Sequence, residues 1–367
     1  MSRVCAIVGG GLAGFVAYAA LRKGGLDSAE IVVFGTDSDP AAAWRVRAAA
    51  IRQRRMRSES DGHCAPTSFP GLAVHAARRR RSFVPLAESV CDRFHPTVEE
   101  FLEHVEDLRA KTSWDESYQL ARIGSVRARE GGFEVDDRGC FPHVLLAPGH
   151  PGLALPEELA GDPRVVHAYD LHDYADEVEV VGAGMAAATE WLNALAAGAS
   201  VVSVRRREPE RRPLNLPREL FTRRGLAAYH ETPPAVRATY LRRHSAPSYP
   251  PGRRWDEPLE RARREGRFSV ATAVNGGRQI ICATGFERGF RKDALLTRLV
   301  ADHGLETVAD WIVLTPDSTV PALTDAERTL ALAGAPAQWS FPAADTLVGA
   351  KYAARRFLRK VQAWRTR

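Results

Sequence analysis

The stretch VCAIVGGGLAG, residues 4–14, decides the fold of this chain. Its apolar run, residues 4–8, predicts a buried parallel strand, and small residues at helical spacing follow the glycines. The pattern G-x-G-x-x-G binds dinucleotides when it joins a strand to a helix, which is its setting here. Gly9 allows the tight turn, Gly11 lets the backbone approach a pyrophosphate, and Gly14 lets the helix lie close on the sheet.

The start of the predicted helix offers what a phosphate needs. Free backbone N–H groups and a partial positive charge at a helix N-terminus attract anions. We therefore expect Leu12 and Ala13 to contact the dinucleotide together with the glycines. The alternative is a glycine-rich turn that holds no ligand.

The second predicted strand, residues 30–34, ends without the acidic residue that usually holds the ribose hydroxyls of a bound dinucleotide. Gly35 stands at that position, and the polar residues TDSD follow it. Either Asp37 reaches the ribose instead, or the contact is missing.

The opening pattern recurs in VEVVGAGMAAA, residues 178–188, where a strand again leads through glycines into a helix. We expect this turn to bind a second dinucleotide through four residues, Gly182, Gly184, Met185 and Ala186.

Arginines occupy the place after the next strand, residues 201–204, where an acidic residue would bind a ribose. An arginine cannot accept a hydrogen bond from a 2′-hydroxyl but can pair with a 2′-phosphate. Arg205 and Arg206 therefore favour NADPH over NADH. The alternative is a solvated strand end.

Each glycine pattern is followed by strands that end in a small-residue turn, Ala147-Pro148-Gly149 in one case and Ala283-Thr284-Gly285 in the other. Glycine pairs predict two hairpins before these turns, over residues 121–136 and 268–283.

Near the C-terminus, Asp345 and Thr346 can cap a helix over residues 347–361. The N-terminus of this helix, at Leu347, would favour electron-rich flavin oxygens. The layout predicts an α/β fold with two Rossmann-like domains and β-meander crossovers.

Two other stretches stand out. Residues 52–70 are polar and irregular, which is typical of a functional loop. Thr97 and Glu100 form a capping-box pattern that predicts the start of a helix.

Length and composition bound the class of protein. The 367 residues allow two or three domains, and 45% hydrophobic with 26% charged residues is typical of a soluble globular protein. No apolar stretch reaches the roughly 18 residues that cross a bilayer, and no signal peptide precedes the first strand. We therefore expect no membrane partner.

Cysteine content and net charge limit the cellular location and the partners that we expect for the protein. The five cysteines are scattered without a CxxC motif, which favours reduced thiols and a cytoplasmic location. No histidine or cysteine cluster has the spacing of metal ligands, so we expect no metal site. The net charge of +6 comes with arginine runs, but no nucleic-acid motif accompanies them, so nucleic acid is a disfavoured partner.

The order of these pieces resembles the two-dinucleotide-binding flavoproteins, in particular the class B flavin monooxygenases that include the microbial N-hydroxylases of lysine and ornithine. Residues 9–14 look like the FAD fingerprint and residues 182–188 like the NADPH fingerprint. Further segments are similar to those of the N-hydroxylases: the loop 56–70, Glu100-Phe101, 166–169, 214–221 and 283–286. The chain departs from the family pattern at Gly35, before Ala283, where an aspartate is missing, and after His167, where a double serine is missing.

The resemblance implies FAD and NADPH as cofactors and an NADPH-binding domain, residues 151–277, inserted in an FAD-binding domain made of residues 1–150 and 278–367. It also implies roles for individual residues. The cofactor contacts it implies are Ser58, Asp61, Thr67, Thr284, Gly285, Asp345 and Leu347, and the catalytic candidates are Asn215, which would line the pocket, and His63.

Three functions follow as hypotheses. The first is an FAD-dependent, NADPH-using monooxygenase acting on a small-molecule nucleophile with dioxygen, such as an amine N-hydroxylase. The second is an NADPH-dependent flavin reductase or dehydrogenase that inserts no oxygen; the lack of CxxC argues against its disulfide-reductase branch. The third is a non-catalytic nucleotide- or nucleic-acid-binding protein. The substrate and the oligomeric state stay open.

Overall fold

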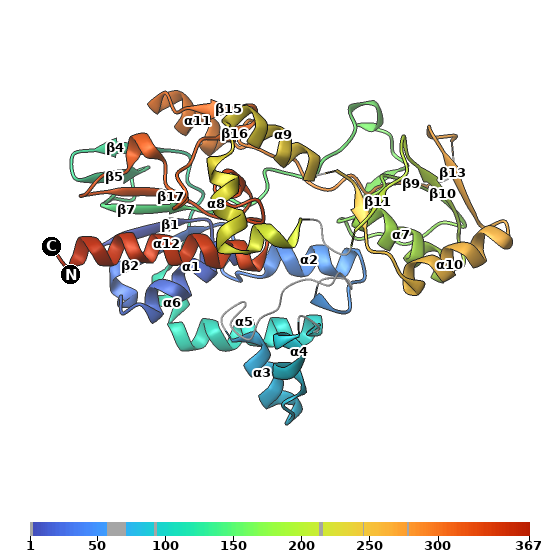
Figure 1. Ribbon diagram of the computed structural model, residues 1–367, viewed down its shortest axis with the longest axis horizontal. Helices are drawn as coiled ribbons and strands as arrows, with labels where there is room; N and C mark the ends of the chain where they lie inside the picture. The colour runs from blue at the N-terminus through green and yellow to red at the C-terminus, as the bar shows by residue number, and fades with distance from the viewer. Residues whose placement is uncertain (1–2, 57–70, 92–93, 213–215, 245, 277–278) are drawn as a thin grey trace.

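Two parallel β-sheets form the cores of two α/β units in the computed structural model (Figure 1). The structure describes residues 3–56, 71–91, 94–212, 216–244, 246–276 and 279–367. The two-domain α/β fold predicted from the glycine patterns is confirmed.

The first sheet is built around the strand that precedes the first glycine pattern. Its order is β17-β7-β1-β2-β3, and all neighbouring strands are parallel. The side chains of β1, β2, β7 and β17 are buried because α-helices cover one face of the sheet and the antiparallel strands between β3 and β7 pack on the other. The strands are β1 (Cys5–Val8), β2 (Ile31–Gly35), β3 (Tyr118–Leu120), β7 (His143–Leu146) and β17 (Thr329–Leu332).

Helices α1 (Leu12–Lys23) and α12 (Leu347–Arg365) pack side by side against this sheet (Figure 1). The predicted C-terminal helix is confirmed, and its cap is Thr346, whose hydroxyl accepts from the Gly349 backbone N–H at 3.1 Å. A three-stranded antiparallel meander lies beside the sheet, formed by β4 (Val126–Arg129), β5 (Gly132–Val135) and β6 (Cys140–Phe141). The first predicted hairpin is therefore confirmed, although β4 starts later than residue 121.

The second sheet has the order β13-β10-β9-β14-β8 and is parallel throughout. Helices α7 (Met185–Ala196) and α10 (Arg253–Arg264) pack on it through a core that contains Trp191 and Trp255. The strands are β8 (Val165–His167), β9 (Glu177–Val181), β10 (Ser200–Val204), β13 (Phe268–Ala271) and β14 (Gln279–Cys282).

The second predicted hairpin is wrong. β13 pairs with β10 and β14 pairs with β9, both in parallel, so two strands separate them. Asn275, in the connection, donates its backbone N–H to the Glu179 carboxylate at 2.9 Å, so this segment crosses a face of the sheet. The local signal Asn-Gly-Gly predicts a turn between the two strands. It does not determine their partners, because each strand adds to a different neighbour in the parallel sheet.

The predicted division of the chain into two domains stays a prediction, but the structure differs from its boundaries in two details. β14 extends the second sheet past residue 277. Helices α8 (Arg223–Glu231) and α9 (Pro234–His244), within the predicted insertion, pack against the first unit. There His230 Nε2 lies 2.6 Å from the Ser340 carbonyl oxygen, and the Tyr229 hydroxyl donates to the Trp339 carbonyl at 3.3 Å. By their packing, α8 and α9 therefore belong to the first unit, although they lie within the predicted insertion in the sequence.

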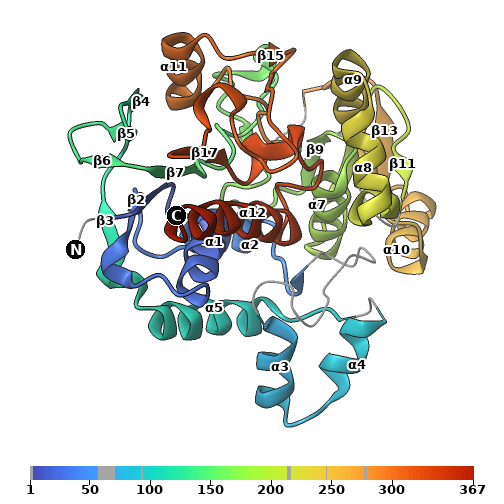
Figure 2. The same ribbon diagram turned by 60° about the vertical axis from the view of Figure 1, so that its left-hand side comes forward.

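Helices α3 (Leu72–Arg80) and α4 (Val84–Val90) project away from both sheets and connect to α5 (Val98–Thr112) (Figure 2). The predicted capping box is confirmed: Thr97 Oγ1 accepts from the Glu100 N–H at 3.1 Å, and Glu100 accepts from the Thr97 N–H at 2.9 Å. The remaining elements are η1 (Ser28–Glu30), α2 (Ala42–Ala50), α6 (Trp114–Ser117), η3 (Glu157–Leu159), β11 (Glu210–Arg211), η4 (Arg218–Phe221), β12 (Ser248–Tyr249), α11 (Ala294–His303), β15 (Thr307–Val308), β16 (Trp311–Ile312), η5 (Pro321–Leu323) and η6 (Ala335–Trp339).

Within the described ranges, no helix combines the length and apolar character needed to cross a membrane.

Candidate dinucleotide-binding sites

The first glycine turn joins β1 to α1 with almost no space between backbone segments. Gly9 has φ +117°, and a Cβ there would lie 2.0 Å from the Ala147 carbonyl oxygen. A Cβ on Gly14 would lie 1.9 Å from the Gly9 carbonyl oxygen. Gly11 is different, because no atom lies within 4 Å of its Cβ position. The protein itself therefore requires Gly9 and Gly14, whereas the space beside Gly11 is open to a ligand.

The N-termini of α1 and α7 both lack side-chain caps in the described chain, and neither helix has an acidic residue in its first turn. Their first backbone N–H groups thus remain available, as a bound phosphate requires. Leu12 and Ala13 begin α1, and Met185 and Ala186 begin α7. The predicted contacts of both turns therefore lie at open helix ends.

Steric crowding explains the missing acid at the end of β2. A Cβ on Gly35 would lie 2.9 Å from the Gly10 backbone nitrogen and 3.0 Å from the Tyr118 hydroxyl. Asp37 lies in the loop just beyond, exposed, with one carboxylate oxygen accepting from the Asp39 backbone N–H at 2.9 Å. Burial, and then the Asp37 carboxylate, raise the pKa of Tyr118. Asp37 therefore stays the candidate for the ribose contact.

The second glycine turn repeats the first. Gly182 has φ +132°, and its Cβ would lie 2.6 Å from the Ala283 carbonyl oxygen at the end of β14. Next to Gly184 the nearest atom to a Cβ is 3.9 Å away, on Pro247. The space in front of α7 is therefore as open as that in front of α1.

The two predicted phosphate-binding arginines differ in exposure. The Arg205 side chain is only 4% exposed, donates to Glu208 at 2.7 Å and lies over the Trp191 ring at 5.4 Å. The Arg206 side chain is 87% exposed, with the Glu158 carboxylate 3.5 Å away. Arg206 is thus the more accessible of the two, and Arg205 packs into the protein.

The chain crosses between the two units at the turns that follow β7 and β14. The crossing segments pair with each other, since the Ala154 N–H donates to the Gly285 carbonyl and the Glu287 N–H to the Gly152 carbonyl, both at 3.0 Å. The Thr284 hydroxyl donates to the Ala154 carbonyl oxygen. Thr284 and Gly285, predicted as cofactor contacts, therefore fasten this crossing together.

A column of stacked rings lies at the same crossing. Phe286 stacks on His150 at 4.5 Å and on Tyr169 at 4.8 Å between ring centroids, and Tyr169 stacks on His167 at 5.7 Å. Burial lowers the pKa of His150, and the Asp345 carboxylate acts in the opposite direction. Asp345, just before α12, therefore lies close enough to His150 to influence its charge.

Arg47, in the last turn of α2, faces the same column. Its guanidinium carbon lies 4.7 Å from the centroid of the Phe286 ring. Burial lowers the pKa of Arg47, and the nearby Tyr169 acts in the opposite direction. Arg47 belongs to no sequence motif and is one of several arginines in its stretch, so the sequence alone does not mark it as a site residue.

Five predicted residues, Ser58, Asp61, His63, Thr67 and Asn215, lie outside the described residues. The described residues contain no cluster of three or more metal-ligating side chains, and the described cysteines are free thiols.

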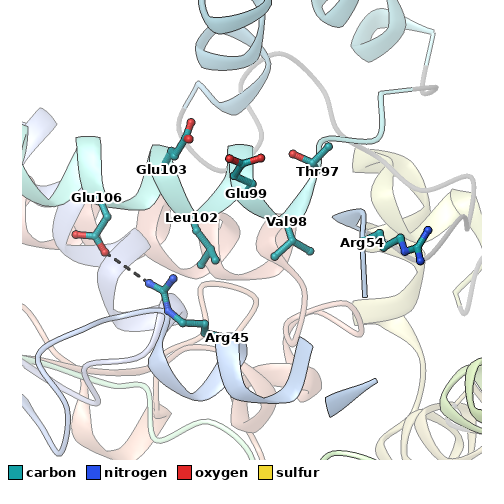
Figure 3. Close-up of a pocket in the computed structure, with 8 residues that line it drawn as sticks. All are labelled: Arg45, Arg54, Thr97, Val98, Glu99, Leu102, Glu103 and Glu106. Atoms are coloured by element: carbon teal, nitrogen blue, oxygen red, sulfur yellow. Dashed lines mark ion pairs between the residues drawn. The ribbon is translucent and has the colours of Figure 1, made fainter. Parts of the chain in front are cut away.

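A cavity of about 680 Å³ lies between α2 and α5 and contains none of the predicted site residues. Figure 3 shows Leu102 and Val98 pointing into it, with Arg45 paired to Glu106 at 3.7 Å. Its full lining is Arg45, Arg54, Thr97, Val98, Glu99, Leu102, Glu103 and Glu106. A second cavity of about 390 Å³ lies beside Glu208, the partner of Arg205, and is bounded by Arg211, Tyr249 and Asp256.

Solved structures share this fold over nearly the whole chain. The ornithine N-hydroxylase of Kutzneria sp. 744, solved with reduced FAD, NADP⁺ and L-ornithine, has a TM-score of 0.70 at 14% identity and covers 99% of both chains. The ornithine hydroxylase of Pseudomonas aeruginosa has a TM-score of 0.68 at 16% identity, covering 98% of this chain and 100% of its own. The bacillithiol disulfide reductase of Bacillus cereus scores 0.55 at 13% identity, covering 98% and 99%.

No protein-family model and no curated protein sequence matches the chain. The likeness is therefore one of structure, and it agrees with the pair of glycine turns and the two parallel sheets. The chain therefore shares its overall fold with the ornithine N-hydroxylases and the bacillithiol disulfide reductase.

Proposed function

We propose that this protein is an FAD-dependent, NADPH-using monooxygenase that hydroxylates a small-molecule nucleophile such as an amine. The observation that carries the proposal is the pair of open, uncapped helix ends, one in each α/β unit, each preceded by a glycine turn that leaves space for a pyrophosphate. The fold likeness to two ornithine hydroxylases supports the reaction class.

The residues at both turns fit the cofactors that the fold implies. Gly9, Gly11 and Gly14, with the N–H groups of Leu12 and Ala13, would hold the FAD pyrophosphate, and α12 would point its N-terminus at the flavin ring. Gly182, Gly184 and the first residues of α7 would hold NADPH, with its 2′-phosphate at Arg206. When bound, the two cofactors supply hydride transfer and the activation of dioxygen.

The chain's own part is to hold the two units in a fixed relation and to keep water from the space between them. The paired crossing segments and the stacked rings of His150, Phe286 and Tyr169 would line that space. An environment of this kind protects reactive oxygen chemistry from side reactions with water.

A second candidate is an NADPH-dependent flavin reductase that inserts no oxygen. The fold likeness to a bacillithiol disulfide reductase favours it, and the lack of a CxxC motif argues against a dithiol mechanism.

The deciding experiment is to purify the protein, load it with FAD, and follow NADPH oxidation, dioxygen uptake and product with L-ornithine, L-lysine and simple diamines. A monooxygenase forms a hydroxylamine in proportion to the NADPH consumed. A reductase consumes NADPH and reduces an added electron acceptor, with no hydroxylated product. Protein that stays colourless after incubation with FAD contradicts both and promotes the non-catalytic alternative.

A further inference from the structure

The order of the second sheet divides a dinucleotide bound there into two halves. Strand β9, which leads into the glycine turn, lies between β10 on one side and β14 on the other. Ligands of such sheets lie across the carboxyl ends of the strands, at the point where the connections diverge. Arg206 follows β10, so the adenosine half with its 2′-phosphate belongs on that side. The nicotinamide half therefore extends over the end of β14, toward the first unit.

The end of β14 is where the ring column lies. Phe286, four residues beyond β14, stacks on His150 from the first unit and on Tyr169. Its ring is therefore held by neighbours within the protein. Arg47 reaches this point from α2, a helix of the first unit, and brings a positive charge to the nicotinamide side.

The described residues provide no carboxylate partner for Arg47. In contrast, Arg45, on the same helix, pairs with Asp39 at 3.0 Å and with Glu106 at 3.7 Å. Arg47 is half-buried against aromatic rings, and a guanidinium held in such surroundings gains most from a charge-assisted bond to an anion. The His150 Nδ1 atom in the same column is buried without a hydrogen-bond partner among the described residues.

We propose that Arg47 binds the nicotinamide-side phosphate of the second dinucleotide, reaching it from the first α/β unit. The inference rests on the proposed use of NADPH and adds a contact that joins the two units through the ligand. It makes the relative position of the units part of the coenzyme site, since the α7 N-terminus holds one side of the pyrophosphate and Arg47 the other.

The test is the affinity of the FAD-loaded protein for two probes, NADP⁺ and 2′,5′-ADP, measured by calorimetric titration. The second probe keeps the adenosine and the 2′-phosphate but lacks the nicotinamide-side phosphate. Arg47→Met keeps the aliphatic length and removes the charge. It should weaken NADP⁺ binding by about tenfold or more while leaving 2′,5′-ADP binding within about twofold, because one charge-assisted contact is lost. Arg47→Lys, which keeps a charge, should lose less.

The matched control is Arg45→Met, which removes a charge from the same helix and should change neither affinity. Flavin content and circular dichroism establish that each variant folds, and if Arg47→Met does not fold, Arg47→Gln takes its place. Unchanged NADP⁺ affinity, or an equal loss for both probes, overturns the role of Arg47 while the proposed function stands. A wild-type protein that binds neither probe contradicts the use of NADPH itself.

Discussion

Glycine occupies positions 11 and 14 of the first turn for two different physical reasons. Gly14 sits where a side chain would overlap the Gly9 carbonyl oxygen, so the protein needs it with or without ligand. Gly11 has φ −75° and an open Cβ position, so the polypeptide alone would accept alanine there. A pyrophosphate lying against the backbone, as predicted for this turn, would favour glycine at that place.

This difference predicts opposite behaviour for two alanine variants. Gly11→Ala should change the stability of the FAD-free protein by no more than about 0.5 kcal/mol and weaken FAD binding by about tenfold. Gly14→Ala should destabilise the FAD-free protein by about 1–3 kcal/mol, since the helix must shift away from the sheet. Urea unfolding and FAD titration of both variants check this. Equal FAD affinity for Gly11→Ala and the wild type would argue against a ligand at this turn.

A buried histidine of β7 should make stability depend on pH. His143 is 1% exposed, and burial lowers its pKa to about 4. The unfolded chain binds a proton near pH 6.5 and the folded chain does not, so stability is complete above about pH 6.5 and falls as the pH drops toward 4. The loss amounts to about 3 kcal/mol at about 1.4 kcal/mol per pH unit.

His143→Phe should remove this part of the dependence, because phenylalanine keeps a ring against the edge of Trp364, whose centroid is 5.1 Å away. Urea unfolding of both proteins at pH 7 and pH 4.5 measures the difference. A wild type that loses no more stability than the variant contradicts the prediction.

Among the elements, the projecting pair α3 and α4 is attached to α5 through ion pairs, of which the one between Arg80 and Glu100 involves a buried carboxylate. Arg80 binds Glu100 with two hydrogen bonds, of 2.6 and 2.7 Å, and Glu100 is 3% exposed. Burial acts to raise the pKa of Glu100, but the Arg80 bonds and the Thr97 N–H outweigh it, so the pKa is lowered. The carboxylate that starts α5 thus also holds α3 in place.

Arg80→Met should cost about 3 kcal/mol at pH 7, because it leaves a buried carboxylate without its partner. The cost should shrink as the pH falls through the pKa of Glu100, where the lone carboxylate takes up a proton. Arg79→Met is the control: Arg79 pairs with Glu99 and Glu103 at 3.1 and 2.9 Å, but these carboxylates are 72% and 44% exposed, so its loss should cost less than about 1 kcal/mol. Equal costs in urea unfolding would refute the special role of Arg80.

At the scale of the whole molecule, the end of α2 is one of the places where the first unit contacts the second. Asn193 of α7 donates to the Ile51 carbonyl at 2.9 Å, and the Arg52 guanidinium lies 4.5 Å from the Tyr174 ring centroid. Behind Tyr174, the fully buried Glu190 accepts from the Tyr174 hydroxyl at 2.8 Å and lies 3.1 Å from His172 Nε2. A buried carboxylate thus supports the surface on which the first unit rests.

This contact predicts a second pH effect, of opposite sign to that of His143. Burial acts to lower the pKa of His172, but the bond to Glu190 outweighs it and raises the pKa. The ion pair therefore stabilises the fold below about pH 6.5, and the contribution is lost as the pH rises through the raised pKa. Glu190→Gln should bring the pKa of His172 below 6.5, measured by NMR titration of the ring protons. An unchanged pKa in that variant would contradict the pairing, and Glu177→Gln, at an exposed position, is the control.

Sequence by itself determined the features whose causes are local. A strand, a glycine turn and a helix follow one another within about 20 residues at both sites, and the capping box of α5 spans four residues, so neighbouring side chains and backbone geometry decide them. Only the tertiary structure decided the pairing of β13 and β14, the burial of Arg205 against the Trp191 ring of α7 and the place of Arg47 beside Phe286. Each of these depends on segments far apart in the chain, because the partner that covers a strand or an arginine is set by packing and not by its sequence neighbours.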